Sequence, residues 1–212
     1  MYLWRMEDVL GVYQLSYDPL RPVICYDERP CFLIGDTIVP LPIKPGKPKR
    51  IDYHYERKGF ANLLIAFEPL TGRRYVQITK QRTKREYAHF LKSVSDTYYP
   101  HAEQIILVQD NLNTHTPAAF YQEFDAELAL ELTERFDMHY TPTNGSWLNM
   151  AEIELSAISR QCLKRRIADK ETLQREVQAC VNTRNEKRIK VDWQFSINKA
   201  RDKFSRFYPN NS

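Results

Sequence analysis

Three acidic residues follow short apolar runs or a turn-rich loop, where a hydrophobic core would meet solvent, and together they could do metal chemistry. Asp27 ends the apolar run 22–26, and Asp110 ends the run 104–109. Glu152 follows a loop rich in Pro, Asn, Gly and Ser and opens an expected helix. If the two runs are neighbouring strands, their final carboxylates lie side by side, and a helix packed across that edge brings Glu152 to them. Oxygen-only ligands suit Mg²⁺ or Mn²⁺, which complete their coordination with water and substrate phosphates.

Each of these carboxylates also has an ordinary structural explanation. Asp after a strand often forms a turn or caps a helix, and Glu in a first helical turn complements the helix dipole. Glu28 and Glu154 lie close by in the sequence, so residue type alone does not select the three acids. His115, five residues after Asp110, could support a metal ligand or position a phosphate, or simply hydrogen-bond the backbone near a helix start.

Hydrophobic periodicity predicts the elements that must position these residues. We expect strands at 22–27, 61–67, 75–79, 104–110 and 137–140, and helices at 4–16, 84–98, 117–134, 148–167 and 170–186. The Pro/Lys-rich segment 28–59 favours an irregular insertion or a hairpin over core elements. Hairpin-linked strands followed by strands that alternate with helices indicate a mixed α/β architecture, with its site in the loops at one sheet edge.

Composition and motifs exclude several classes of protein. The chain has 212 residues, 42% of them hydrophobic, which is enough for one domain with a real core. It has neither an apolar run of 18 residues nor a signal peptide, so we expect neither a membrane protein nor a secreted one. The four cysteines lack C-x-x-C spacing and fit reduced packing thiols. P-loop, Rossmann, zincin and α/β-hydrolase motifs are missing, so no nucleotide cofactor is expected.

The formal net charge of +4 conceals a strong grouping of charges. Residues 153–212 carry 14 Lys and Arg against seven Asp and Glu, and residues 73–92 carry seven bases against one acid. Residues 101–138 carry one base against eight acids. Such grouping is compatible with a nucleic-acid partner and equally with a solvated basic face that binds nothing.

Three motifs resemble those of one known family. They are Val-Ile-Cys-Tyr-Asp27-Glu28, then Gln-Asp110-Asn111-Leu-Asn-Thr-His115, then the segment 139–152, which reads His-Tyr-Thr-Pro-Thr-Asn-Gly-Ser-Trp-Leu-Asn-Met-Ala-Glu. In this order they resemble the DDE transposases of bacterial insertion sequences in the mariner-like superfamily. The resemblance runs from about residue 17 to residue 208. Since 41 residues separate Asp110 from Glu152, somewhat more than is usual in mariner relatives, Glu154 stays open as an alternative.

The resemblance implies a fold, a cofactor and a reaction. The fold is RNase H-like, a mixed five-stranded sheet flanked by helices, with the Pro/Lys-rich insertion after the first strand. Asp27, Asp110 and Glu152 would bind two Mg²⁺ ions, with Mn²⁺ as a substitute. The site would use water to nick DNA at the ends of the element and then use the freed 3′-OH to join target DNA, with the protein acting as a homodimer on DNA.

Seven further residues are expected to support the site or contact DNA: Asn111, His115, Trp147, Asn149, Lys164, Arg165 and Arg166. The two asparagines could orient carboxylates or phosphate oxygens. Trp147 could pack against DNA or belong to the core. The three cations belong to the basic C-terminal part of the chain.

Residues 1–20 are expected to form a linker helix, and residues 21–212 the catalytic domain with basic C-terminal helices. Family members usually carry an N-terminal helix-turn-helix region that recognises terminal repeats, and residues 1–20 cannot form one, so we expect it to be absent from this chain. We expect a bacterial cytoplasmic location near the nucleoid. Two other functions stay open: an RNase H-like nuclease, and an inactive transposase-derived protein that only binds DNA.

Overall fold

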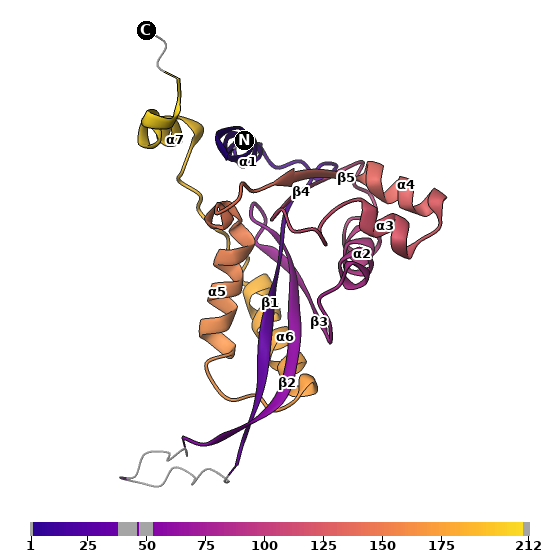
Figure 1. Cartoon of the computed structure of the whole chain (residues 1–212), viewed down its shortest axis with the longest axis vertical. Coiled ribbons are helices and arrows are strands. Elements are labelled where there is room, and N and C mark those ends of the chain that lie inside the picture. The colour runs from indigo at the N-terminus through magenta and orange to yellow at the C-terminus, as the bar shows by residue number, and fades with distance from the viewer. Residues whose placement is uncertain (1, 38–45, 47–52, 210–212) are drawn as a thin grey trace.

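One mixed β-sheet organises the chain, which a computed structural model describes over residues 2–37, 46 and 53–209. Its strands are β1 (Val23–Asp36), β2 (Tyr55–Glu68), β3 (Arg73–Thr79), β4 (Ile105–Gln109) and β5 (Phe136–Tyr140). They lie in the order β3-β2-β1-β4-β5 (Figure 1). β1, β2 and β3 pair antiparallel, whereas β4 pairs parallel with both β1 and β5. The expectation of a mixed five-stranded sheet is confirmed.

Helices cover both faces of this sheet. They are α1 (Tyr2–Val12), α2 (Lys84–Ser93), α3 (Ala118–Glu123), α4 (Ala126–Arg135), α5 (Met150–Cys162), α6 (Lys170–Glu186) and α7 (Ile197–Lys203). A π-helical turn (Val94–Tyr98) continues α2, and 3₁₀ turns occupy Ser146–Leu148 and Ser205–Phe207. None of the helices in the described ranges is long and apolar enough to cross a membrane.

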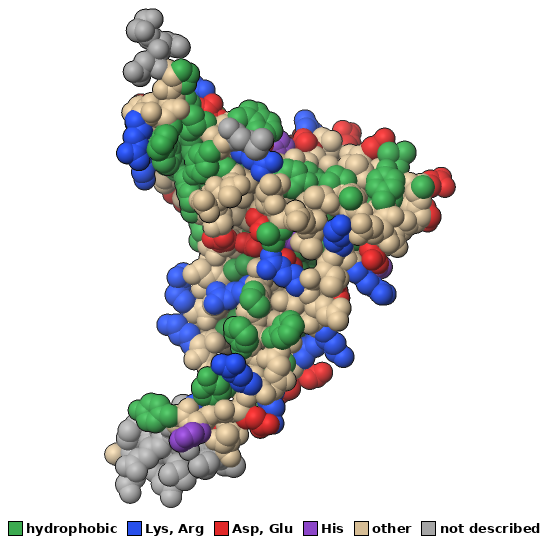
Figure 2. All heavy atoms as spheres, in the orientation of Figure 1, with side chains coloured by type: hydrophobic (Ala, Val, Ile, Leu, Met, Phe, Trp, Pro, Cys, Tyr) green, Lys and Arg blue, Asp and Glu red, His purple; other side chains and the backbone are tan. Residues whose placement is uncertain are grey.

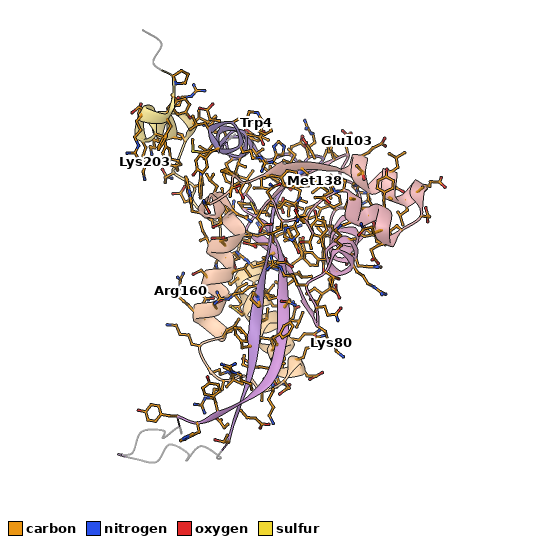
Figure 3. The ribbon with its side chains drawn as sticks, viewed as in Figure 1. Trp4, Lys80, Glu103, Met138, Arg160 and Lys203 are labelled. Atoms are coloured by element: carbon orange, nitrogen blue, oxygen red, sulfur yellow. The ribbon has the colours of Figure 1, made fainter. Side chains whose placement is uncertain are left out.

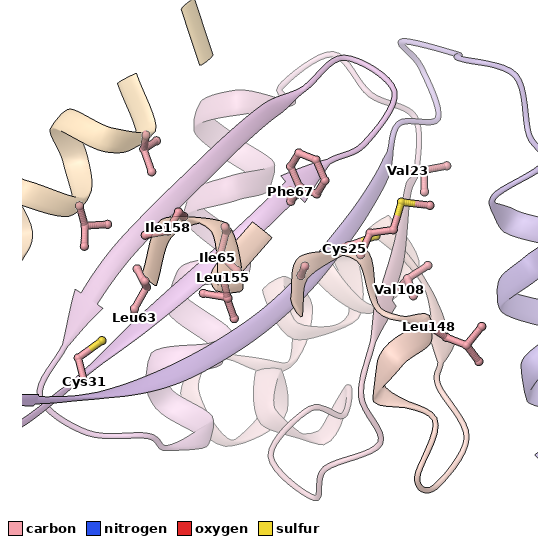
Figure 4. Packing of buried hydrophobic residues seen from close by; sticks show 14 of the residues in the cluster. Val23, Cys25, Cys31, Leu63, Ile65, Phe67, Val108, Leu148, Leu155 and Ile158 are labelled. Atoms are coloured by element: carbon pink, nitrogen blue, oxygen red, sulfur yellow. The ribbon is translucent and has the colours of Figure 1, made fainter. Parts of the chain in front are cut away.

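Alternation along the central strands divides the core into two clusters, because successive side chains of a strand point to opposite faces. Val23 and Cys25 of β1 pack in the cluster that contains the apolar residues of α1, α5, α6 and α7. Figure 4 shows part of this cluster, with Leu155 and Ile158 of α5 against Leu63 and Ile65 of β2. Ile24 and Tyr26 of β1 pack in the other cluster, with α2, α3 and α4.

The same alternation assigns the two acids that follow on β1 to different faces. Asp27 has the parity of Cys25 and belongs to the α5 face, whereas Glu28 has the parity of Tyr26 and belongs to the α2 face. Two adjacent carboxylates of one strand therefore meet different surroundings.

The segment 28–59 is not irregular at its ends. β1 runs on to Asp36 and β2 begins at Tyr55, and the two form a paired arm that extends beyond the body of the domain (Figure 1). The alternation of buried Cys31 and Leu33 with exposed neighbours keeps this stretch of β1 extended. Of the two alternatives for 28–59, the hairpin agrees with the structure at both ends of the segment. The Pro/Lys-rich tip falls in residues 38–52, most of which lie outside the described residues.

Two predicted helices have wrong boundaries. The segment 117–134 is two helices, because Asp125 leaves helical geometry and caps α4 by accepting a hydrogen bond from the Leu128 N–H (3.0 Å). The segment 148–167 is helical only from Met150 to Cys162. Beyond α5 the chain returns to the arm, where the Ile167 carbonyl accepts a hydrogen bond from the Ile34 N–H (2.7 Å) next to a bulge in β1.

The remaining elements agree with expectation to within a few residues, and α6 matches its predicted bounds. Four apolar residues of α1 (Met6, Val9, Leu10 and Val12) are buried in the core cluster of the α5 face. The four cysteines are free thiols, of which Cys25 and Cys31 are buried.

Candidate active site

The parallel pairing of β1 with β4 places two of the predicted acids at opposite positions on neighbouring strands. Val23 pairs with Ile106, Ile24 with Leu107 and Cys25 with Val108. Continuing this register by two residues places Asp27 opposite Asp110, which directly follows the last residue of β4. Both carboxylates therefore lie at the edge that the sheet has where β4 ends. Asp110 lies just past β4, whereas Asp27 does not end its strand as expected, because β1 continues beyond it into the arm.

Asn149 brings the third acid to this edge. Its side-chain oxygen caps α5 by accepting a hydrogen bond from the Ala151 N–H (3.1 Å), and its amide donates to the Tyr26 carbonyl (2.8 Å). Asn149 is 1% exposed, so both bonds are shielded from water. The start of α5 is thereby attached to β1 one residue before Asp27, with Glu152 in its first turn.

The electrostatics of Asp27 show that the three acids interact. Burial raises the pKa of Asp27 from its usual 3.8 to about 7, although the hydrogen bond from the Glu28 N–H (2.7 Å) opposes the rise. The charges of Asp110 and Glu152 raise the pKa further, and His115 lowers it. Figure 2 shows acidic side chains gathered where the N-terminal end of α5 meets the sheet.

His115 is a buried partner of Asp110. Its Nδ1 hydrogen-bonds Asp110 Oδ1, and its Nε2 lies 3.2 Å from Glu28 Oε1. Burial lowers the pKa of His115, but the hydrogen bonds and charges of the two carboxylates outweigh it, so the net pKa is raised. A protonated ring donates to both carboxylates, which holds one oxygen of Asp110 in place.

Side chains on the α2 face hold His115 in turn. Its ring stacks on Tyr87, with centroids 4.9 Å apart, and meets Tyr26 edge-on at 5.0 Å. The Tyr87 hydroxyl donates to the buried Gln109 side chain (2.8 Å), whose amide donates to the His115 carbonyl (3.2 Å). Sequence reasoning missed Tyr87 and Gln109, because in a chain of unknown topology they are indistinguishable from ordinary core residues.

Glu154 has a different role from Glu152, although only one residue separates them. Its side chain is 1% exposed and pairs with Arg74 of β3 (2.7 Å) and Arg184 of α6 (2.6 Å). Arg74 also donates to the carbonyls of Gly72 and Ile189. Glu154 thus joins α5 to β3 and α6 inside the core, and this ion-pair network leaves Glu152 as the acid at the sheet edge.

The donor set fits a divalent cation in its chemistry. Three carboxylates supply hard oxygen ligands, and their mutual repulsion is relieved by a cation. In the part of the chain that the structure describes, no three His, Cys, Asp or Glu side chains are already grouped to hold a metal. The Glu28 N–H and His115 each bond only Oδ1 of their acid, Asp27 and Asp110 respectively, so these hydrogen bonds leave Oδ2 of each carboxylate to a cation.

The other predicted residues lie at different distances from this edge. Trp147 precedes α5, is 40% exposed and meets Phe195 edge-on at 5.4 Å. Asn111 is exposed in the loop after β4. Lys164, Arg165 and Arg166 follow the C-terminal end of α5, which lies about 15 Å along the helix axis from Glu152.

Arg165 and Arg166 are engaged within the chain. Arg165 pairs with Glu176 of α6. Arg166 pairs with Asp36 at the end of β1 (2.7 Å), donates to the His54 carbonyl (3.0 Å) and lies over the Tyr55 ring. The structure therefore gives Arg166 a role in holding the β1–β2 arm, for which the sequence offered no sign.

A five-stranded sheet of this order, with acids gathered at the edge of its central strands, defines the RNase H-like class of fold. Within that class, a family model described as DDE superfamily endonuclease matches residues 22–174. The match covers most of the chain and includes all three acids, so the chain belongs to this family.

Solved structures share the fold at low sequence identity. The Mos1 mariner paired end complex with Mn matches with a TM-score of 0.59 and 16% identity, over 88% of this chain and 56% of that one. The Mos1 strand transfer complex matches with a TM-score of 0.55 and 15% identity, over 91% of this chain and 62% of that one. The pre-cleavage Mos1 transpososome matches with a TM-score of 0.54 and 16% identity, over 88% of this chain and 60% of that one. The chain thus spans less than two thirds of these proteins, and no curated protein matches it.

Replacing Asp27 by Asn should change how stability depends on pH. The folded-state pKa of about 7 lies above the usual 3.8, so Asp27 contributes most stability below pH 4 and loses it as the pH rises through 7. In EDTA, the free energy of unfolding of Asp27→Asn should therefore gain roughly 2–3 kcal/mol on the parent between pH 5 and 8. Urea denaturation followed by tryptophan fluorescence measures this, with the exposed Asp202→Asn as control. Parallel pH profiles for parent and Asp27→Asn would contradict the raised pKa.

Glu154 and Glu152 should differ sharply in their effect on stability. Glu154→Ala leaves Arg74 and Arg184 without their buried partner and should cost about 3–5 kcal/mol. Glu152→Ala removes a half-exposed charge that repels Asp27, and should change the free energy of unfolding by less than about 1 kcal/mol. Urea unfolding at pH 7.5 compares the two variants, and similar losses in both would refute these separate roles.

Proposed function

We propose that the chain is the catalytic domain of a transposase that cuts and joins DNA at the ends of a mobile element. The observation that carries this proposal is the placement of Asp27, Asp110 and Glu152 at one sheet edge in a DDE superfamily endonuclease. The three sequence motifs support an origin in a mariner-like bacterial insertion sequence, with the protein acting in the bacterial cytoplasm near the nucleoid.

In this proposal the three acids hold Mg²⁺, or Mn²⁺ in its place, as two ions. When bound, such ions activate an attacking oxygen and stabilise a leaving one at phosphorus. Asp27 and Asp110 supply ligands from β1 and β4, and Glu152 supplies one from α5. His115 holds one oxygen of Asp110, and Asn149 keeps the first turn of α5 against β1.

The same residues would serve two reactions in succession. In the first, water attacks the phosphorus at an element end and the 3′-oxygen leaves, which nicks the strand. In the second, that 3′-OH attacks a phosphodiester of target DNA, and a new bond replaces the broken one. Both reactions are in-line displacements, so no covalent protein intermediate is needed.

DNA is the proposed partner, bound by a homodimer. The Mos1 neighbours are described as a paired end complex and a strand transfer complex, and the shared fold supports an equivalent use of this chain. The half-exposed Trp147 and the exposed Asn111 are proposed to contact DNA beside the carboxylates.

Asp110→Asn and Glu152→Gln should abolish nicking and leave DNA binding unchanged. Each substitution removes a carboxylate from the proposed site with little change in shape, so the rate of nicking should fall at least 100-fold. Conversion of supercoiled plasmid to open circle in Mg²⁺ or Mn²⁺ measures nicking, and fluorescence anisotropy measures binding.

Two matched substitutions serve as controls. Asp137→Asn changes an acid on β5, and Glu171→Gln changes an acid in the first turn of α6, as Glu152→Gln does in α5. Both should nick at the parent rate. Undiminished nicking by the two site variants would overturn the assignment, and faster cleavage of an RNA–DNA hybrid than of DNA would favour an RNase H-like nuclease instead.

A further inference from the structure

A groove leads from the carboxylate edge along α5 toward the β1–β2 arm. Beside the acids it is a hollow lined by Trp147, Glu152, Ile153, Ser156 and Arg160. It continues into a larger hollow of about 480 Å³ that shares Ser156 and Arg160 with the first. Because both hollows are lined by Ser156 and Arg160, they adjoin each other along α5.

The wall formed by α5 is a single helical stripe. Glu152, Ser156 and Arg160 recur every four residues, so they lie on one side of α5, and Lys164 follows just beyond the end of the helix. At 1.5 Å per residue the stripe is about 12 Å long, which matches roughly three to four nucleotides of a duplex strand at 3.4 Å each. The opposite wall includes Arg29 of β1, whose parity places it on the same face as Asp27.

The groove is strongly basic away from the acids. Arg29, Arg160, Lys164 and Arg165 all line the larger hollow. Within the described ranges only Arg165 of these four forms an ion pair, and Arg160 donates to the Ser156 hydroxyl (3.0 Å). Figure 2 shows Lys and Arg side chains along this face, and Figure 3 shows Arg160 reaching outward from α5.

We propose that this groove binds the backbone of one DNA strand as that strand leaves the carboxylate site, with Arg29, Arg160 and Lys164 contacting successive phosphates. The inference rests on the proposed function, because it takes the scissile phosphate to lie beside Glu152. It adds two cations, Arg29 and Arg160, that the sequence did not single out, and it leaves out Arg166, which holds the arm.

Charge and shape favour a nucleic-acid strand as the occupant. Cations with no acidic partner among the described residues are suited to phosphates, and the hydroxyl of Ser156, which accepts a hydrogen bond from Arg160, can donate to a phosphate oxygen. The end of the groove nearest the acids is lined by Glu152, so a strand bound in it would lead toward the carboxylate site. Apolar residues such as Ile34 and Leu163 lie in its floor and can contact sugars.

The test compares two double variants of the full chain. Arg160→Gln/Lys164→Gln removes two groove cations, whereas Arg85→Gln/Lys92→Gln removes two cations of α2, which packs on the opposite face of the sheet. Binding of a fluorescein-labelled 20-base-pair duplex is measured by anisotropy between 50 and 200 mM NaCl. The groove variant should bind at least tenfold more weakly at 50 mM, and its slope of log affinity against log salt should be shallower by roughly 1–2.

A charge-preserving variant separates phosphate binding from folding. Arg160→Lys/Lys164→Arg should keep the salt slope of the parent, because both positions remain cationic. An unchanged slope in the groove variant, or an equal loss in the α2 variant, would overturn the proposal.

Plasmid nicking by the parent tests the proposed function separately. If the parent binds DNA but does not nick it, and only the groove variant loses binding, the groove stands and the proposed function fails. If the parent nicks plasmid and the groove variant binds as the parent does, the groove fails and the proposed function stands. A parent that neither binds nor nicks DNA refutes both.

Discussion

The buried side chain of Asn149 is the constraint on which the site depends. The hydrogen bond that its side-chain amide donates to the Tyr26 carbonyl fixes where α5 meets β1. Its side-chain oxygen caps α5 and so ends the preceding loop. Because both bonds are shielded from water, breaking either leaves a buried polar group unsatisfied, which costs about 1–3 kcal/mol. The position of Glu152 relative to Asp27 depends on this residue, which is itself neither one of the acids nor a direct partner of one.

The first turns of α5 separate two acids by function. Glu154 faces the core, where Arg74 and Arg184 neutralise it and join three elements. Glu152 faces the sheet edge, where its charge adds to the cost of ionising Asp27. One helix therefore contributes both to the stability of the fold and to the candidate active site, because the ion pairs of Glu154 hold in place the turn that carries Glu152.

The two faces of the sheet contribute differently to the acidic edge. The α2 face supplies support, because Glu28, Tyr87 and Gln109 hold the ring of His115 against Asp110. The α5 face carries Asp27 and opens into the basic groove. A modest net charge thus conceals a surface on which an acidic centre adjoins a cationic track.

The sequence by itself determined most of the elements, because strand alternation and helical periodicity are local properties of the chain, and it indicated Asp27, Asp110 and Glu152 as candidates with Glu154 as an alternative. It also indicated the mixed sheet, since hairpin-linked strands and strands alternating with helices restrict how a sheet can form. Hydrophobic periodicity was insufficient at two helix boundaries. At Asp125 a local side-chain cap starts a second helix, and beyond Cys162 the chain leaves α5 and returns to the distant β1–β2 arm.

Only the tertiary structure decided which neighbouring acid does which work. Glu152 and Glu154 have the same side chain and lie two residues apart, and their difference arises from two arginines 80 and 30 residues away from Glu154 in sequence. The placement of Asp27 opposite Asp110 likewise depended on the register in which β1 pairs with β4. Residue types can be read along the chain, but the charge and solvent around each one depend on residues that folding brings next to it.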